Sequence, residues 1–358
     1  METRKNALIA MSGGVDSTTA AWLMKEAGYN CEGVTMLLFR NADIGRQDLR
    51  TCCSQKDVDD AATVAFSMDI PYRVLDFTEE FKKFVIDDFV RAYESGLTPN
   101  PCIECNRHMK FDLLLEYALE NGFDCLVTGH YARVGRGADG RYLLKKALDP
   151  SKDQSYVLYG LTQEQLAHLA FPLGSLTKEN VRRLAAERGF VNSRKPDSQD
   201  ICFIPGGDYG EFLESYTGKE YPPGDYIDSG GNRVGTHRGA VRYTIGQRKG
   251  LRLAMGRPVY VCAKNMENNT VTVGDEELLF SDVLTARDVN WVSVPRQTEP
   301  FTCTARTRYR QKEKRATAYP LEDGRIRVVF DESQRAITPG QSAVLYDGDT
   351  VLAGGIIE

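Results

Sequence analysis

The chain has 358 residues, of which 42% are hydrophobic and 27% charged, and its formal net charge is −5 at pH 7. This composition is typical of a globular protein of two or three domains. The negative net charge argues against a general nucleic-acid-binding protein, and the odd number of dispersed cysteines argues against a disulfide-rich secreted domain. No window approaches about 20 consecutive apolar residues, which argues against a membrane partner. We therefore expect a cytoplasmic protein whose nine cysteines are mostly reduced thiols.

The first 205 residues alternate between strand and helix patterns. Short apolar runs predict strands at 7–11, 32–39, 72–76 and 125–128, and amphipathic runs predict helices at 16–26, 55–67 and 112–121. The alternation predicts a Rossmann-like α/β domain over residues 1–205, with a doubly wound parallel sheet whose ligands lie at the carboxyl ends of its strands.

Beyond residue 205 the sequence changes to short strand candidates separated by Gly, Pro and Asp-Gly turns. We expect a small central module with a hairpin over residues 206–278 and a C-terminal β-barrel over residues 279–358.

Two windows in this second half, 237–252 and 303–318, are rich in Arg and Lys and nearly free of acids. Either window alone is most simply the solvated face of a strand. Together, and with Tyr243 and Tyr309 among the cations, they indicate a polyanionic partner, because clustered cations bind phosphates whatever the net charge.

The segment SGGVDS, residues 12–17, joins the first predicted strand to the first predicted helix. Its glycines allow close approach to a ligand, and the helix N-terminus favours an anion, so the loop predicts a phosphate site. It is neither a Walker A loop nor a dinucleotide fingerprint. It resembles the loop of the PP-loop ATP pyrophosphatases, which implies that Ser12 and Ser17 bond phosphate and that Asp16 supports Mg²⁺. Several synthetases share the loop, so it leaves the substrate open.

Later motifs narrow the substrate. The segments SGGVDS, TPNPCIECN, GHYAR, KDQSYVLY, DSQDICFIP, TIGQRKGL, TRYRQ and TPGQSAV, in that order, closely resemble the tRNA-specific 2-thiouridylase (MnmA/TrmU) family from residue 7 to residue 358. The resemblance implies that ATP adenylates O2 of the wobble uridine of a tRNA and that sulfur then replaces this oxygen, giving 2-thiouridine, AMP and pyrophosphate. The competing functions, a PP-loop amide synthetase and a non-catalytic tRNA-binding protein, explain fewer of these motifs.

The resemblance also implies site residues. In the family scheme Cys202 receives sulfane sulfur as a persulfide, and Cys105 completes the transfer as nucleophile, which leaves a Cys105–Cys202 disulfide. The sulfur donor is a persulfide carrier protein or sulfide. The implied ATP site comprises Ala10, Met11, Ser12, Gly13, Gly14, Val15, Asp16, Ser17, Met36 and Gly129. The implied tRNA contacts are Asn100, Pro101 and Cys102 at the target base, with His130, Lys152, Asp153, Gln154, Arg308, Tyr309 and Gln341. Alternatively, His130 is a core histidine and residues 152–154 are a solvated turn. We expect a monomer.

One position departs from the family. The commoner motif has N-P-D-x-x-C-N, and Cys102 replaces its aspartate, so that three thiols, Cys102, Cys105 and Cys202, could hold a [4Fe-4S] cluster. The cluster and the persulfide relay both stay open, whereas zinc is weaker because a fourth ligand is missing. The two prolines predict a rigid loop, not a regular helix, over TPNPCIECN. Cys52 and Cys53 are more simply packing or capping residues than sulfur-transfer residues.

Overall fold

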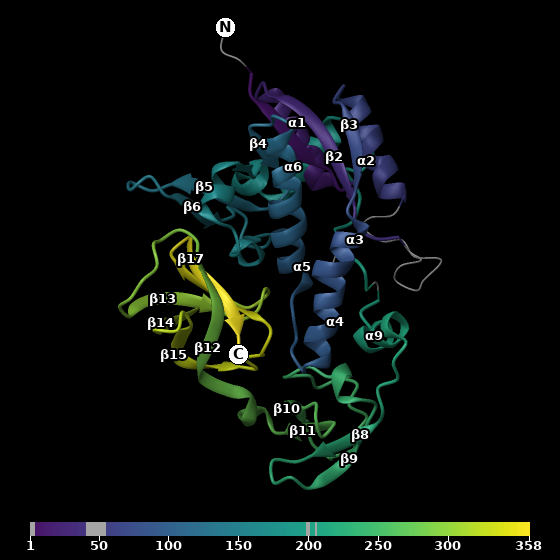
Figure 1. The fold of residues 1–358 in the computed structure, drawn as a ribbon, viewed down its shortest axis with the longest axis vertical. Coiled ribbons are helices and arrows are strands. Elements are labelled where there is room, and N and C mark those ends of the chain that lie inside the picture. Colours follow the sequence, from purple (N-terminus) through teal and green to yellow (C-terminus); the bar gives the residue numbers. More distant parts are fainter. Residues whose placement is uncertain (1–3, 41–54, 198–200, 205) are drawn as a thin grey trace.

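The computed structural model describes residues 4–40, 55–197, 201–204 and 206–358, so Cys52 and Cys53 lie outside the described residues. Figure 1 shows the N-terminal sheet at one end of the molecule, the central module at the other, and the C-terminal barrel beside a column of helices between them. Among the described residues, no helix is both long and apolar enough to cross a bilayer.

The N-terminal sheet is parallel and has the strand order β3-β2-β1-β4-β7. Its strands are β1 (Asn6–Ala10), β2 (Asn30–Leu37), β3 (Tyr72–Asp76), β4 (Cys125–Val127) and β7 (Leu169–Ala170). The prediction of a doubly wound sheet is confirmed. The order reverses around β1, so a crevice is expected at the carboxyl ends of β1 and β4.

Helices cover both faces of this sheet because side chains of β1 alternate between them. Ala7 and Ile9 pack with α1 (Val15–Glu26), α2 (Gln55–Ser67) and α8 (Lys178–Glu187), whereas Leu8 packs with α6 (Leu115–Glu120). The remaining helices of the first part are short: α3 (Thr78–Phe81), α4 (Asp87–Glu94), α5 (Pro101–Glu104) and α7 (Gln163–Ala167).

The predicted loop over TPNPCIECN is wrong for most of its length. Asn100 is the N-cap of α5, and its Oδ1 accepts a hydrogen bond from the Cys102 amide at 3.2 Å. Pro101 occupies the first helical position, where an amide hydrogen is not needed and the fixed φ of proline suits a helix. The helix continues through the wide turns of Cys105–Leu114 into α6, so Cys102 and Cys105 lie on a helix.

The C-terminal part is a closed six-stranded antiparallel barrel, as predicted. Its strands are β12 (Phe280–Trp291), β13 (Phe301–Arg306), β14 (Lys314–Pro320), β15 (Ile326–Arg335), β16 (Ser342–Asp347) and β17 (Thr350–Ile357), and β12 pairs with β17 to close it. An unpredicted hairpin, β5 (Ala132–Arg136) and β6 (Tyr142–Lys146), extends from the N-terminal part and joins the barrel through Lys145 and Thr350. This contact ties the barrel to the first half of the chain.

The central part begins with one helix, which is followed by a four-stranded sheet in the order β10-β11-β8-β9. Its elements are α9 (Tyr209–Thr217), β8 (Gly224–Ile227), β9 (Arg233–His237), β10 (Tyr260–Asn265) and β11 (Thr270–Gly274). The antiparallel pair β8–β9 is a hairpin of the expected kind.

Candidate active site

The loop after β1 has a fixed shape. The Ser12 amide donates to Ser17 Oγ at 3.1 Å, which folds the loop over the first turn of α1. Gly13 has φ +68°, and a Cβ added there would lie 2.3 Å from the carbonyl oxygen of Asp57, so this position requires glycine. Within the described chain no side chain caps α1 at Gly14. The first amides of the helix therefore face the loop and favour a phosphate.

Two residues far along the chain hold the loop from behind. Asn192 Nδ2 donates to the Gly13 carbonyl at 3.2 Å, and Lys195 Nζ donates to the same oxygen at 3.0 Å. Lys195 is itself held by Asp57 at 2.6 Å and Asp60 at 2.8 Å. Because the segment 192–195 bonds to the loop and is itself held by α2, the loop is organised before a ligand arrives.

Gly129 lies directly beyond the end of β4, next to α1. A Cβ added to Gly129 would come within 2.8 Å of the Ser17 amide nitrogen, so glycine is what lets the end of β4 approach the helix start. This places the predicted Gly129 and the serine loop at the strand-order reversal, the position at which α/β sheets bind ligands.

A cavity of about 360 Å³ opens at this edge of the sheet. Thirteen of the residues implied by the family resemblance line it: Ala10, Met11, Ser12, Asp16, Ser17, Met36, Pro101, Cys102, Cys105, Gly129, His130, Gln154 and Cys202. The structure thus brings the phosphate loop and all three cysteines to one cavity. Gly13, Gly14, Val15, Asn100, Lys152, Asp153, Arg308, Tyr309 and Gln341 are not among its lining residues.

The three cavity cysteines differ in exposure. Cys102 is exposed on α5, whereas Cys105 and Cys202 are partly buried, and no disulfide joins any of the described cysteines. Burial raises the pKa of Cys105 to about 11, with the charge of Lys110 lowering it and that of Cys102 raising it. The Cys105 thiol is therefore protonated at neutral pH, and it becomes a nucleophile only when a base or a cation acts on it.

The cysteines do not form a metal site as they are placed. Over residues 4–40, 55–197, 201–204 and 206–358, no group of three or more Cys, His, Asp or Glu side chains is arranged to hold a metal ion. Cys102, Cys105 and Cys202 nevertheless line the same cavity. The [4Fe-4S] cluster and the persulfide relay therefore both stay predictions.

His130 forms a buried polar group with residues of the cysteine helix. It is 7% exposed, its Nδ1 lies 2.7 Å from Thr128 Oγ1, and its Nε2 lies 3.5 Å from Lys110 Nζ. Burial first, and then the charge of Lys110, lower the pKa of His130 well below its ordinary value, so the ring is neutral. Lys110 also donates to Asn106 Oδ1 at 2.9 Å. Lys110 and Asn106 were missed from the sequence, although they lie four residues apart, the spacing of neighbours on one helix face.

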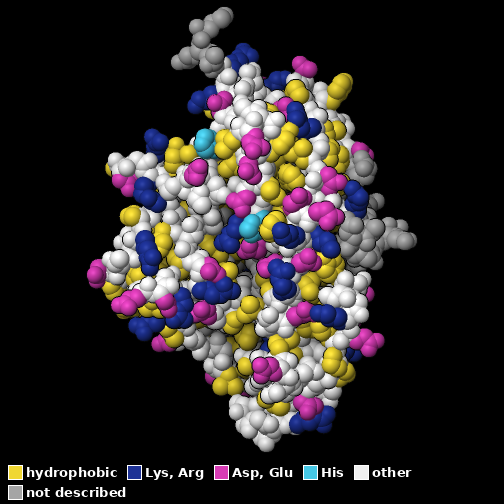
Figure 2. All heavy atoms as spheres, viewed as in Figure 1, with side chains coloured by type: hydrophobic (Ala, Val, Ile, Leu, Met, Phe, Trp, Pro, Cys, Tyr) yellow, Lys and Arg dark blue, Asp and Glu magenta, His cyan; other side chains and the backbone are white. Residues whose placement is uncertain are grey.

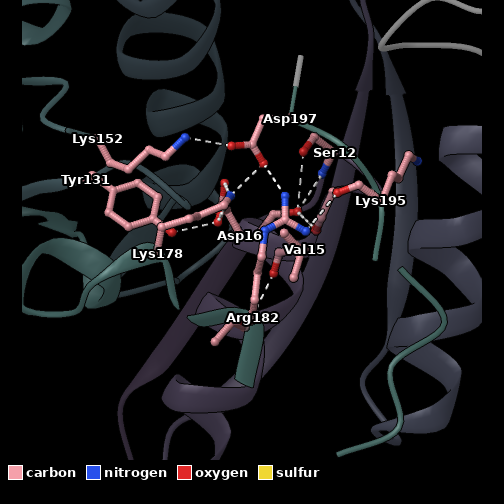
Figure 3. A network of polar contacts seen from close by, with 12 residues as sticks. Ser12, Val15, Asp16, Tyr131, Lys152, Lys178, Arg182, Lys195 and Asp197 are labelled. Atoms are coloured by element: carbon pink, nitrogen blue, oxygen red, sulfur yellow. Dashed lines mark hydrogen bonds and ion pairs between the residues drawn. The ribbon is translucent and has the colours of Figure 1, made fainter. Parts of the chain in front are cut away.

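Asp16 is paired with a buried cation. Lys178 Nζ lies 2.8 Å from both carboxylate oxygens of Asp16, and the Tyr131 hydroxyl donates to Asp16 Oδ1 at 2.8 Å (Figure 3). The Lys178 side chain is 10% exposed. It lies in the first turn of α8, where a cation is unfavourable without a carboxylate beside it.

The same lysine reaches a second carboxylate. Asp197 Oδ1 accepts from Lys178 at 2.8 Å and from Arg182 at 2.7 Å, and its Oδ2 accepts from Lys152 at 2.8 Å (Figure 3). Burial alone would raise the pKa of Asp197, but the bonds from Lys152 and Lys178 outweigh it and lower the pKa to about 2. Sequence reasoning had no signal for Lys178 or Arg182.

Asp153 and Gln154 have separate places. The Asp153 side chain is 2% exposed, its Oδ1 accepts from the Ala147 amide at 3.1 Å, and its Oδ2 pairs with Arg306 of the barrel at 3.0 Å. Gln154 lines the cavity while its Oε1 accepts from the Tyr131 amide at 2.9 Å. The segment 152–154 is thus no simple solvated turn, because it links the barrel, the cavity and Asp197.

Arg308 and Tyr309 lie where the barrel meets the other parts. Arg308 Nη2 donates to the carbonyls of Ile245 at 3.0 Å and Ala336 at 3.1 Å, which joins the barrel to the central module. Tyr309 is 37% exposed, and burial, with the nearby charges of Asp153 and Cys102, raises its pKa. Tyr309 is therefore an exposed aromatic ring close to the outer cysteine.

Gln341 connects the barrel to the segment before the cysteine helix, the continuous helix of residues 101–120 that carries Cys102 and Cys105. Its Nε2 donates to the Thr98 carbonyl at 2.7 Å, and the Thr98 amide donates to the Pro339 carbonyl at 2.9 Å. Gly340 has φ +88°, and a Cβ there would lie 2.8 Å from the Thr98 nitrogen. The TPGQ segment of the barrel is thus docked on the TPNPC segment.

Cations of the two basic windows divide into structural and exposed ones. Arg242 pairs with Glu214 and lies only 14% exposed, like Arg306. The exposed members are Arg238, Arg248, Lys249, Arg252, Arg310, Lys312, Lys314 and Arg315. Figure 2 shows cations and acids interspersed on one face, without a continuous basic patch there.

Family comparisons cover almost the whole chain. Residues 5–206 match the family described as tRNA methyl transferase HUP domain, 210–275 the tRNA methyl transferase PRC-barrel domain, and 281–357 the aminomethyltransferase beta-barrel domain. The tRNA-specific 2-thiouridylase MnmA of Acetivibrio thermocellus is 50% identical over 99% of this chain and all of its own length. The protein of the same name from Moorella thermoacetica is 51% identical over 98% of this chain and 99% of its own.

Solved structures are more distant. A 4-thiouridine synthetase–RNA complex with bound ATP is 22% identical, covers 56% of this chain and 46% of its own, and has a TM-score of 0.30. The NMN synthetase of Francisella tularensis is 13% identical over 61% of this chain and 79% of its own, with a TM-score of 0.34.

Proposed function

The chain belongs to the tRNA-specific 2-thiouridylase family, and from this premise we propose that its cavity replaces O2 of the wobble uridine of tRNA by sulfur at the expense of ATP. The observation that carries the proposal is the single cavity in which the phosphate loop, Cys105 and Cys202 meet. An amide synthetase would need the loop but not the cysteines, and a tRNA-binding protein would need neither. The 1–205 part would hold the catalysis, with residues 206–278 and 279–358 helping to hold the tRNA.

ATP would place its phosphates on the loop of residues 12–17. Amides at the start of α1 and the hydroxyls of Ser12 and Ser17 are donors for phosphate oxygens, and Gly129 leaves room beside them. Asp16 carries the carboxylate that would hold Mg²⁺, an ion that prefers oxygen ligands and neutralises phosphate charge. O2 of the uridine then attacks the α-phosphorus, pyrophosphate leaves, and C2 carries AMP as a leaving group.

Sulfur transfer would use both inner cysteines. A persulfide on Cys202, whose outer sulfur is sulfane sulfur received from the persulfide of a carrier protein that is left as a thiol, attacks C2 through its terminal sulfur, and AMP departs. The Cys105 thiolate then attacks Cys202 Sγ. The bond between Cys202 Sγ and the sulfur attached to C2 breaks, and 2-thiouridine leaves with the electron pair of that bond. The resulting Cys105–Cys202 disulfide needs an external dithiol to return both thiols.

We propose the persulfide route because it needs only Cys105 and Cys202, which both line the cavity. Iron analysis of anaerobically purified protein tests this choice. We expect full thiolation by iron-free protein, and activity that strictly requires bound iron would contradict it.

The RNA would lie along Cys102, Tyr309 and Lys152. Tyr309 presents an exposed ring for stacking on a base, and Asn100 with Pro101 sets the start of the helix at the target base. His130 and Gln154 are held in the cavity wall. Arg308 and Gln341 would hold the barrel surface in place as well as contact RNA.

The decisive experiment is incubation with ATP, Mg²⁺, unmodified tRNA and either sulfide or a persulfide donor, followed by nucleoside analysis. We expect 2-thiouridine to form, with one AMP and one pyrophosphate released for each sulfur. Absence of 2-thiouridine with both sulfur sources, while the protein is folded and binds ATP, would overturn the proposal.

A further inference from the structure

Lys110 is an uncompensated cation in the wall of the cavity. It is the one Lys or Arg among the described residues that line the cavity, and Asp16 is the one carboxylate. Asp16 is balanced, because Lys178 Nζ lies 2.8 Å from both of its oxygens. Lys110 has no such partner, since no carboxylate oxygen of the described chain lies within 4.0 Å of its Nζ.

The polar groups that contact Lys110 are neutral. Its Nζ donates to Asn106 Oδ1 at 2.9 Å and lies 3.5 Å from Nε2 of His130, whose pKa is lowered well below its ordinary value by burial and then by the charge of Lys110. Asn106 is in turn anchored, because its Nδ2 donates to the Val157 carbonyl at 3.1 Å. The ammonium is thus held in place while its charge stays unbalanced, and a partly buried cation of this kind favours an anionic ligand.

Wide helical turns bring Lys110 to the side of Cys105. The stretch Cys105–Leu114 is π-helical, so its backbone hydrogen bonds join residues five apart, and Lys110 lies one turn along from Cys105. In a regular α-helix the same two residues would point about 140° apart. Burial raises the pKa of Cys105 and the charge of Lys110 opposes this rise, as expected for neighbours on one helix face. The helix therefore presents a thiol and an ammonium to one cavity.

The proposed reaction builds up negative charge at one phosphate. The α-phosphorus is bonded first to the pyrophosphate on the loop and then to O2 of the uridine, so its phosphate lies between the loop and the base. When sulfur replaces AMP at C2, the C2–O bond breaks and its electron pair stays on the oxygen. A singly charged phosphodiester thereby becomes AMP, whose phosphate is close to doubly charged at neutral pH. A cation at this phosphate stabilises the departure of AMP more than the adenylation, because the charge grows as AMP leaves.

We propose that Lys110 is a catalytic residue of the sulfur-transfer step, whose ammonium binds the α-phosphate of the adenylated uridine and stabilises AMP as the leaving group. This assignment rests on the proposed function, in which ATP adenylates the base. The amides and hydroxyls of the loop stabilise the departing pyrophosphate in the first step, and Lys110 stabilises the departing AMP in the second. Each leaving group thus has its own donor in the cavity.

The experiment measures the two steps separately in the full-length protein. ATP labelled at the α-phosphorus, Mg²⁺ and unmodified tRNA are first incubated without a sulfur donor, and label on the tRNA reports adenylation. A persulfide donor is then added for a single turnover, in which loss of label from the tRNA and formation of 2-thiouridine report the second step. Calorimetry with an ATP analogue that has a methylene between the α and β phosphates measures nucleotide binding.

Three variants of Lys110 and one control are compared. Lys110→Met should slow the second step about a hundredfold, as for loss of one donor to a developing oxyanion, so that adenylated tRNA accumulates. Its affinity for the analogue should change by less than about threefold, because the α-phosphate gains no charge on binding. Lys110→Gln removes the charge but keeps a donor for Asn106 and should behave alike, which covers the case that Lys110→Met fails to fold. Lys110→Arg restores a cation and should react at least about tenfold faster than Lys110→Met. Lys219→Met alters a 59% exposed residue that pairs with Glu94 outside the cavity lining, and it should keep the wild-type rates.

The outcomes separate the two proposals. If the wild type yields neither labelled tRNA nor 2-thiouridine, the proposed function fails. If the wild type completes both steps while Lys110→Met and Lys110→Gln carry out the second step within about threefold of its rate, the role of Lys110 is overturned. Equal loss of nucleotide binding and of both steps in all three variants, Lys110→Arg included, would assign Lys110 to the structure of the cavity and overturn the proposal as well.

Discussion

The nucleotide side and the sulfur side of the cavity are built in different ways. On the nucleotide side, Gly13 is fixed by Asn192, Lys195 and the backbone of Asp57, so the loop has its working shape in the absence of ligand. On the sulfur side, Cys105 is a protonated thiol at neutral pH, since burial raises its pKa to about 11. The phosphate loop is thus preformed for binding, whereas Cys105 must lose its proton before it can act as a nucleophile.

This difference has a chemical rationale. A thiolate held permanently beside bound ATP would react with oxidants and other electrophiles, because the thiolate is the reactive form of cysteine. A phosphate loop has no such hazard, and its organisation lowers the entropic cost of binding. The four predictions below test whether the two sides are separable in this way.

The largest effect is expected from Cys202→Ala. Thiolation should fall by about a thousandfold or more, as for loss of a nucleophile, while adenylation of tRNA continues because the loop is untouched. Nucleoside analysis measures the first, and release of labelled pyrophosphate measures the second. Cys262→Ala, in the central sheet and away from the cavity lining, is the control and should keep both activities. Equal loss of both activities in Cys202→Ala would show that the two sides are not separable.

Gly13→Ala should damage the nucleotide side. The added Cβ would lie 2.3 Å from the Asp57 carbonyl at a φ of +68°, so we expect a loss of about 2 kcal/mol of stability and a tenfold or greater loss of ATP affinity. Gly28→Ala is the matched control, because φ is +87° there but the new Cβ would meet no described atom within 4 Å. It should cost about 1 kcal/mol without changing ATP affinity. Denaturant unfolding and calorimetry measure the two quantities, and unchanged ATP affinity in Gly13→Ala would contradict a prepared loop.

The sequence alone predicts the elements that depend on local residue patterns. Apolar runs locate β1 and β3, and the helix 55–67 has the bounds predicted for it, because periodicity is a local property. The cysteine helix was missed because Pro101 was interpreted as a breaker, whereas at the first helical position it favours a helix. Lys178 and Lys195 could not be found, since each acts on a residue more than 130 positions away and follows no motif.

The pH dependence of labelling at Cys105 tests the sulfur side. Because only the thiolate reacts and the pKa is about 11, the rate of alkylation should rise about tenfold for each pH unit from pH 7 to pH 9.5, without a plateau. The same shift has a stability consequence. The folded protein holds the Cys105 thiol proton more tightly than the unfolded chain does. The protonated thiol therefore contributes to the free energy of unfolding below the ordinary thiol pKa, and this contribution is lost as pH rises toward 11. A plateau in the labelling rate below pH 9 would mean that the thiol is already activated.

The smallest effect is expected from Gln341→Leu, which removes the bond to the Thr98 carbonyl between the barrel and the cysteine helix. We expect a loss of about 1 kcal/mol in denaturant unfolding, as for one hydrogen bond, and a rise in the KM for tRNA with little change in kcat. Gln297→Leu is the control, because Gln297 donates to the exposed carbonyl of Pro295, two residues away in the same loop, and it should change neither. If tRNA binding weakens while the unfolding curve stays unchanged, Gln341 acts on the RNA directly and not by holding the barrel against the helix. The sulfur side would then depend on the RNA itself to bring its parts together, which would widen the contrast with the prepared nucleotide loop.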